Sequence, residues 1–150
     1  MKIKFTLLFM LLATLLAGCL HNNQTFEFQQ GIDQIENIEI LYKEDYNTYI
    51  LDAQMPVLKT LDPAEYRPLI DAVQAAQGGR FAPPGDGFGY YIIRITYQDG
   101  MTELVGDTNS GFIAPGEKLK YNSFRFNKEE YLGIISSFLG EEVTEPPYDG

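Results

Sequence analysis

Acidic side chains are the most plentiful candidates for chemistry in this chain, and four of them fall near one another in the sequence: Asp86, Asp99, Glu103 and Asp107. Carboxylates can act as a general acid and base, or they can bind a hard cation such as calcium. The segment from Asp107 to Gly111 starts like a calcium-binding loop, but the next acid, Glu117, comes too late and follows a proline. The favoured interpretation is therefore a turn whose Asp and Asn side chains bond their own backbone. A metal site at Asp86, Asp99 and Asp107 is the alternative.

The only cysteine follows a stretch that has the layout of an export signal. Two lysines give a cationic start, residues 5–16 form an almost unbroken apolar run, and small residues precede Cys19. The run is too short to span a bilayer, which takes ~20 apolar residues. The sequence Leu-Ala-Gly-Cys at 16–19 resembles the lipobox of bacterial lipoproteins, in which the cysteine thiol receives a diacylglycerol. This resemblance implies that residues 1–18 are cleaved off and that Cys19 anchors the protein by lipid.

The lipobox resemblance also implies a location, and it makes the membrane, through the lipid anchor, the first expected partner. A lipid on Cys19 would hold the protein in the cell envelope, on the extracytoplasmic side of a bacterial membrane. A conventional secreted protein with a cleavage site near a cysteine is the alternative interpretation.

The residues that usually carry nucleophilic or transition-metal chemistry are scarce. The single histidine, His21, lies two residues after Cys19, where no folded pocket is expected to hold it. Catalytic pairs of Ser with His or Cys with His are therefore not expected, and neither are zinc or copper sites. We predict a protein that is not an enzyme and holds no cofactor. A hydrolase that uses two carboxylates is a further alternative, because only their separation in space decides it.

The composition predicts one acidic domain. Removal of residues 1–18 leaves nine of the eleven basic residues against 21 acidic ones, a net charge of −12. Such a domain is repelled by nucleic acid and by anionic lipid head groups, so neither is an expected partner. With Cys19 lipidated, no disulfide can form. Stability must then come from packing, to which ten Tyr and ten Phe can contribute.

Hydrophobic periodicity predicts an α+β domain over residues 34–140. In its first half we expect a half-buried strand over 35–42, a returning strand over 47–52, and a helix that Asp62 caps and Gln77 to Gly79 ends. In the second half we expect a strand over 90–97, an Asp99-Gly100 turn, three further strands, and a helix that runs from Asn127 to Gly140. The last of these strands, 119–126, changes its apolar parity near Asn122 and Ser123, which indicates a bulge.

This order of elements is typical of a two-layer fold with a mainly antiparallel sheet and two helices on one face. Residues 19–33 are predicted to be a polar tether and residues 141–150 a flexible acidic tail. Residues 93–100 read Ile-x-Ile-x-Tyr-x-Asp-Gly. With the capped helix over 127–139, they resemble small lipoproteins of Gram-positive bacteria. The resemblance implies a compact α+β domain without an assigned activity, and it transfers no catalytic residue.

The glycine-rich segment 78–89 is the remaining candidate for a site. It lacks the Lys-Ser or Lys-Thr ending of a phosphate-binding loop, and it follows a helix instead of leading from a strand into one. This segment either exposes its aromatic side chains to a partner or folds its two phenylalanines inward. The predicted partner surface consists of Arg80, Phe81, Phe88 and Tyr90. We therefore predict a non-enzymatic binding domain for an envelope protein or peptide, with a small-ligand or calcium-binding domain as the alternative.

Overall fold

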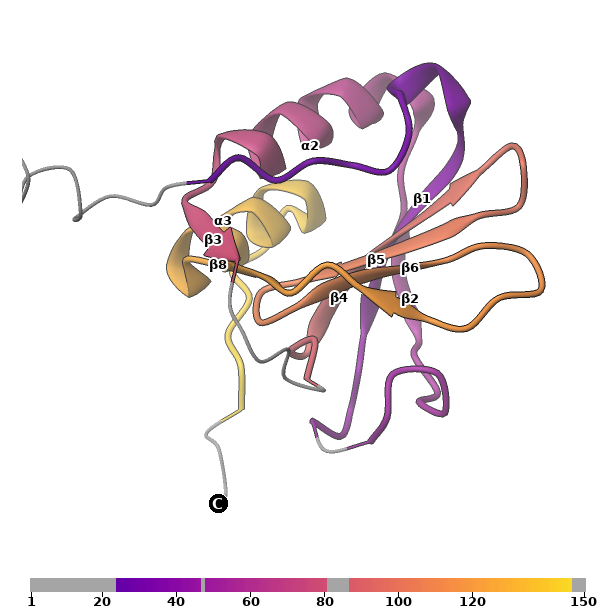
Figure 1. Ribbon diagram of the computed structural model, residues 1–150. Helices are drawn as coiled ribbons and strands as arrows, with labels where there is room; N and C mark the ends of the chain where they lie inside the picture. Colours follow the sequence, from indigo (N-terminus) through magenta and orange to yellow (C-terminus); the bar gives the residue numbers. More distant parts are fainter. Residues whose placement is uncertain (1–23, 47, 81–86, 147–150) are drawn as a thin grey trace, which may run out of the picture.

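A computed structural model describes residues 24–46, 48–80 and 87–146. In this part of the chain, two helices cover one face of an antiparallel sheet, as Figure 1 shows. The elements are, in order, the 3-10 turn η1 (Ile32–Gln34), β1 (Ile35–Tyr42), β2 (Val57–Thr60), α2 (Pro63–Ala75), β3 (Gly78–Arg80), β4 (Tyr91–Tyr97), β5 (Thr102–Gly106), β6 (Ser110–Ile113), β7 (Lys120–Tyr121), β8 (Phe124–Phe126) and α3 (Lys128–Leu139). The predicted two-layer α+β class is confirmed.

The main sheet has the strand order β2-β1-β4-β5-β6-β7, and every neighbouring pair is antiparallel. At its centre β1 lies against β4, with Ile38 opposite Ile95 and Ile40 opposite Ile93. These four side chains are buried in the larger core cluster, which also holds residues of both helices. The sheet thus presents a continuous aliphatic face to α2 and α3.

The first predicted hairpin is wrong. Residues 50–52 form a turn, and the strand that returns along the outer edge of β1 is β2. The alternating segment around Ile50 misled the prediction because only Ile50 is buried, whereas Tyr49 and Leu51 are exposed. Ile50 packs into a second, smaller core cluster with Leu41, Ile92, Leu104 and Phe88. Since Leu41 and Ile92 alternate with residues of the first cluster, the second cluster lies on the sheet face away from the helices.

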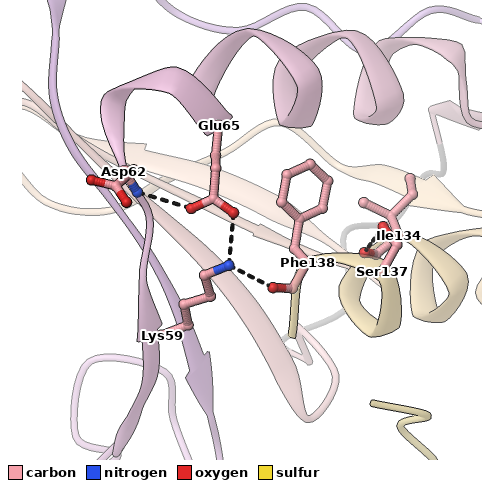
Figure 2. Close-up of polar contacts among 6 residues, drawn as sticks. All are labelled: Lys59, Asp62, Glu65, Ile134, Ser137 and Phe138. Atoms are coloured by element: carbon pink, nitrogen blue, oxygen red, sulfur yellow. Dashed lines mark hydrogen bonds and ion pairs between the residues drawn. The ribbon is translucent and has the colours of Figure 1, made fainter. Parts of the chain in front are cut away.

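Helix α2 begins as predicted. Asp62 is its N-cap, Pro63 is its first residue, and a Glu65 carboxylate oxygen accepts a hydrogen bond from the Asp62 backbone at 2.9 Å. Figure 2 shows an addition that the sequence did not reveal: Lys59 Nζ contacts Glu65 Oε1 at 2.7 Å and the carbonyl of Phe138 at 2.8 Å. One lysine on β2 therefore joins the start of α2 to the end of α3.

Helix α3 also has its predicted caps. Asn127 accepts a hydrogen bond from the Glu130 backbone at 3.1 Å, and Gly140 ends the helix with a φ of 77°. On its inner face, Tyr131 and Ile135 are fully buried, and Ile134 and Phe138 are partly buried. The Tyr131 hydroxyl donates to the backbone carbonyls of two strands, Val105 at 2.6 Å and Tyr91 at 3.1 Å.

The predicted tether and tail are both wrong in their bounds. Phe26 is only 1% exposed and packs against the rings of Phe124 and Phe126 at 5.2 and 5.3 Å. After α3, Val143 is buried in the larger core and Glu145 pairs with Lys128. Residues on both sides of the predicted domain, 34–140, therefore belong to its packed part. Residues 1–23, which include the predicted signal and Cys19, lie outside the described residues.

The segment predicted as one bulged strand over 119–126 is two strands in different sheets. Ser123 adopts a φ of 56°, and this break sends β8 away from the main sheet to pair with β3. Residues 78–80 of the glycine-rich segment thus form the strand β3, which no pattern in the sequence predicts. Within the described residues, neither α2 nor α3 has the length and apolar composition that crossing a membrane requires.

Candidate functional site

A cavity of about 540 Å³ lies where β4 begins, β5 ends and α3 begins, and we refer to it as the Asp107 cavity. Its walls come from six parts of the chain. These are the segment after β1, the start of β4, the end of β5, strand β8, the first turn of α3 and the segment after α3. The lining residues that matter for its chemistry are Tyr46, Tyr90, Asp107, Arg125, Lys128 and Glu145. Six separate parts of the chain thus meet at one place.

Asp107 provides the first buried carboxylate of the cavity. The residue is 4% exposed, and its Oδ1 accepts no hydrogen bond from the residues that the structure describes. Burial, with a smaller effect from the Glu145 carboxylate, raises the pKa of Asp107 to about 6. Gly89 leaves the space for this carboxylate, because a Cβ on Gly89 would lie 1.8 Å from Oδ1, and its φ of 88° also favours glycine.

Glu145 provides the second buried carboxylate. Its side chain is 8% exposed and forms an ion pair with Lys128 through Oε2. Its other oxygen, Oε1, is buried and has no hydrogen-bond partner within the described ranges. The Lys128 ammonium itself lies at the exposed rim, and its pKa is raised chiefly by the hydrogen bond to Glu145. Asp107 and Glu145 thus each have one carboxylate oxygen that is buried and lacks a donor among the described residues.

Aromatic rings form another wall of the cavity. The rings of Tyr46 and Tyr90 lie 5.5 Å apart at 51°, and Tyr42 stacks on Tyr90 at 6.1 Å. Buried Lys43 supports this wall, since its Nζ donates to the carbonyls of Tyr46 and Thr48 at 2.7 and 2.8 Å. Burial, followed by the nearby Glu145 carboxylate, raises the pKa of Tyr90, so its hydroxyl is protonated at neutral pH.

The predicted partner surface does not exist as one surface. Phe88 is 0% exposed and packs in the second core with its ring 5.8 Å from that of Tyr121, so the inward-folding alternative is correct for this residue. Arg80 is exposed on β3, where it lines a different cavity beside Gln24. Tyr90 faces the Asp107 cavity and is nearly buried. Phe81 lies outside the described residues.

Of the three acids proposed for a metal site, the two that the structure describes, Asp99 and Asp107, are not brought together. Asp99 lies in the turn between β4 and β5, and Asp107 follows the opposite end of β5. The Asp99 carboxylate accepts hydrogen bonds from Met101 N at 2.9 Å and from Gln30 Nε2 at 2.7 Å, which lower its pKa. Asp86 lies outside the described residues. Within the described ranges, no group of three or more His, Cys, Asp or Glu residues is placed to hold a metal ion.

Glu103, the fourth acid of the sequence cluster, is inside the domain. Its Oε2 accepts from the Tyr97 hydroxyl at 2.5 Å and from the Gln29 backbone at 3.1 Å, while Oε1 has no partner in the described part of the chain. Burial raises the pKa of Glu103 to about 7, against the two hydrogen bonds, which lower it. This carboxyl group joins the N-terminal segment to the sheet.

Comparisons of the chain with protein-family models, with curated proteins and with solved structures gave no significant match.

Proposed function

We propose that the protein is a lipid-anchored domain of the bacterial envelope that binds a ligand without transforming it, and that the Asp107 cavity is the binding site. The observation that carries this proposal is a cavity of about 540 Å³ whose lining combines two tyrosine rings with the charged side chains of Asp107, Arg125, Lys128 and Glu145. Aromatic walls with a few polar groups are typical of small-ligand sites.

The location of the proposed function depends on Cys19. The lipobox-like sequence and the apolar leader support lipidation there, and the acidic composition supports a ligand other than nucleic acid. The buried position of Phe88 moves the proposed contact away from the glycine-rich segment and into the cavity. A small molecule or a short part of an envelope peptide fits a cavity of this size better than a flat protein surface does.

The experiment has two readouts on the full-length protein expressed in a bacterium. Metabolic labelling with a palmitate analogue should mark the wild type, and Cys19→Ser should abolish both the label and membrane attachment. Membrane attachment that persists in Cys19→Ser would contradict the anchor. Material released by denaturing the purified protein should then contain a stoichiometric ligand that Asp107→Asn loses. An equal yield from both proteins would contradict binding at the cavity.

A carboxylate-dependent hydrolase of an envelope polymer is the second candidate, because two acids line one cavity. The raised pKa of Asp107 suits a general acid, but the ion pair with Lys128 neutralises Glu145. Release of soluble fragments from purified cell-wall polymer by the wild type, and not by Asp107→Asn, would favour the hydrolase. No release would leave binding as the function.

A further inference from the structure

We propose that residues 27–31 form a strap that lies closed over the core while the Glu103 carboxyl group is protonated and opens when that group ionises. The strap lies between the buried ring of Phe26 and the turn η1. Figure 1 shows this part of the chain as the indigo trace that runs along α2. The inference goes beyond the proposed function and does not depend on the Asp107 cavity.

The strap has little packing on either side. A cavity of about 630 Å³ lies between it and the β3–β8 pair, and another of about 410 Å³ lies between it and α2. Its one apolar side chain, Phe28, is only partly buried. Among the described residues, no backbone-to-backbone hydrogen bond involves residues 25–30. Such a segment opens at a lower free energy than the core does.

Both ends of the strap are fixed, so that it can open without the rest of the fold. On one side, Phe26 packs against the rings of Phe124 and Phe126. On the other side, the Gly31 carbonyl accepts a hydrogen bond from Gln34 N at 3.0 Å. Opening is therefore a local movement of five residues between two attached points.

Glu103 ties the middle of the strap to the sheet. Its Oε2 accepts from the Gln29 backbone at 3.1 Å and from the Tyr97 hydroxyl at 2.5 Å. A second link is exposed, since the Gln30 side chain donates to Asp99 at 2.7 Å. Water can replace the exposed bond, but it does not reach Glu103, which is 0% exposed. The state of the Glu103 carboxyl group therefore decides how firmly the strap is held.

The surroundings of Glu103 favour its neutral form. Its neighbours across the sheet, Ile95 on β4 and Phe112 on β6, are apolar. The nearest ionisable groups are the Tyr97 hydroxyl and, beside it, Asp99, and neither supplies a positive charge. None of the ion pairs in the described part of the chain involves Glu103, and its Oε1 has no hydrogen-bond partner there. An ionised carboxylate in this place is relieved when the strap lifts and water enters.

The direction of the pH effect follows from the raised pKa. Burial raises the pKa of Glu103 from 4.5 to about 7 with the strap closed, and exposure to water restores the ordinary value. The closed state therefore binds the extra proton between these pH values, so opening becomes more favourable as the pH rises through this window and is constant above it. A difference of about 2.5 in pKa corresponds to a rise of up to about 300-fold in the equilibrium constant for opening.

Amide hydrogen exchange measures the opening on the full-length protein in detergent micelles, with mass spectrometry as the readout, from pH 4.5 to pH 8. After correction for the intrinsic exchange rate, which also rises with pH, the protection of the strap should fall by up to about 300-fold. The strap should also exchange faster than α3 at every pH, because it opens alone. Equal protection of the strap and α3 would show that the strap opens only by global unfolding, and it would overturn the inference.

Variants link the opening to Glu103. Glu103→Gln cannot ionise and should abolish the fall in protection, whereas Glu27→Gln, at an exposed acid on the strap itself, is the matched control and should keep it. If Glu103→Gln fails to fold, Tyr97→Phe serves instead. It removes a hydrogen bond that lowers the pKa of Glu103, so the fall should move to higher pH. The inference is overturned if protection of the strap does not depend on pH in the wild type, if Glu103→Gln keeps the fall, or if Tyr97→Phe leaves its midpoint unchanged.

Discussion

Replacement of Glu103 by glutamine is expected to change the pH dependence of stability. Glu103 is fully buried, and its pKa is raised by burial from 4.5 to about 7. Between these pH values the folded state therefore holds a proton that the unfolded state releases. Because the folded state binds more protons across this window, the stability of the wild type falls as the pH rises through it. Above pH 7 the carboxylate is ionised in both states.

The size of the effect follows from the rise in pKa. A rise of about 2.5 corresponds to about 3 kcal/mol at 1.36 kcal/mol for each pKa unit. The glutamine side chain of Glu103→Gln cannot ionise, and its amide oxygen can still accept from Tyr97 and from the Gln29 backbone, as Glu103 Oε2 does. The free energy of unfolding of Glu103→Gln, relative to that of the wild type, should therefore be about 3 kcal/mol higher at pH 8 than at pH 4.

Urea unfolding of the Cys19→Ser protein, measured from pH 4 to pH 8 with and without Glu103→Gln, gives this double difference directly. Asp107 also has a raised pKa and lowers stability with rising pH, but it contributes equally to both proteins and cancels. Glu36→Gln, an exposed acid on β1, is the matched control and should leave the pH profile unchanged. Parallel profiles for the wild type and Glu103→Gln would refute the assignment of a protonated, buried Glu103.

Two further substitutions test the parts of the fold that were not foreseen. Phe26→Ala should cost about 3–5 kcal/mol in urea unfolding because its ring fills the core beside β8, whereas a side chain in a loose tether would cost almost nothing. Lys43→Met should cost about 2 kcal/mol and accelerate amide hydrogen exchange over residues 44–53, since it leaves two backbone carbonyls without their donor. Lys118→Met, at an exposed position, is its control, and unchanged exchange in Lys43→Met would contradict the bracing role.

Local signals in the sequence predicted the parts of the fold whose hydrogen bonds are local. The caps at Asp62 and Asn127 close within three residues of their partners, and Gly100 adopts the positive φ that an Asp-Gly turn requires. Strand β2 was missed because the edge strand over 57–60 is mostly exposed on both sides and shows no alternation. Register and strand partners depend on residues far apart in the chain, which periodicity does not encode.

The site could be predicted only in part for the same reason. Asp107 stood out by its type, but Glu145 lies in an acidic, proline-containing segment that resembles a disordered tail. The burial of Phe88 also depends on a residue far away in the chain. The Phe88 backbone packs directly on Gly106, and a Cβ on Gly106 would lie 1.7 Å from the Phe88 carbonyl oxygen. A glycine-rich composition predicts a loop, but it does not predict which ring the loop turns inward.

The point at which Gln24 joins the folded domain would limit how far a domain anchored at Cys19 could reach from a bilayer. Gln24 donates a backbone hydrogen bond to Gly78 at 3.0 Å, only five residues after Cys19. A fully extended chain advances at most about 3.6 Å per residue, so five residues span about 18 Å. With the proposed lipid on Cys19, the domain would stay close to the membrane surface. Its ligand would then have to reach that surface.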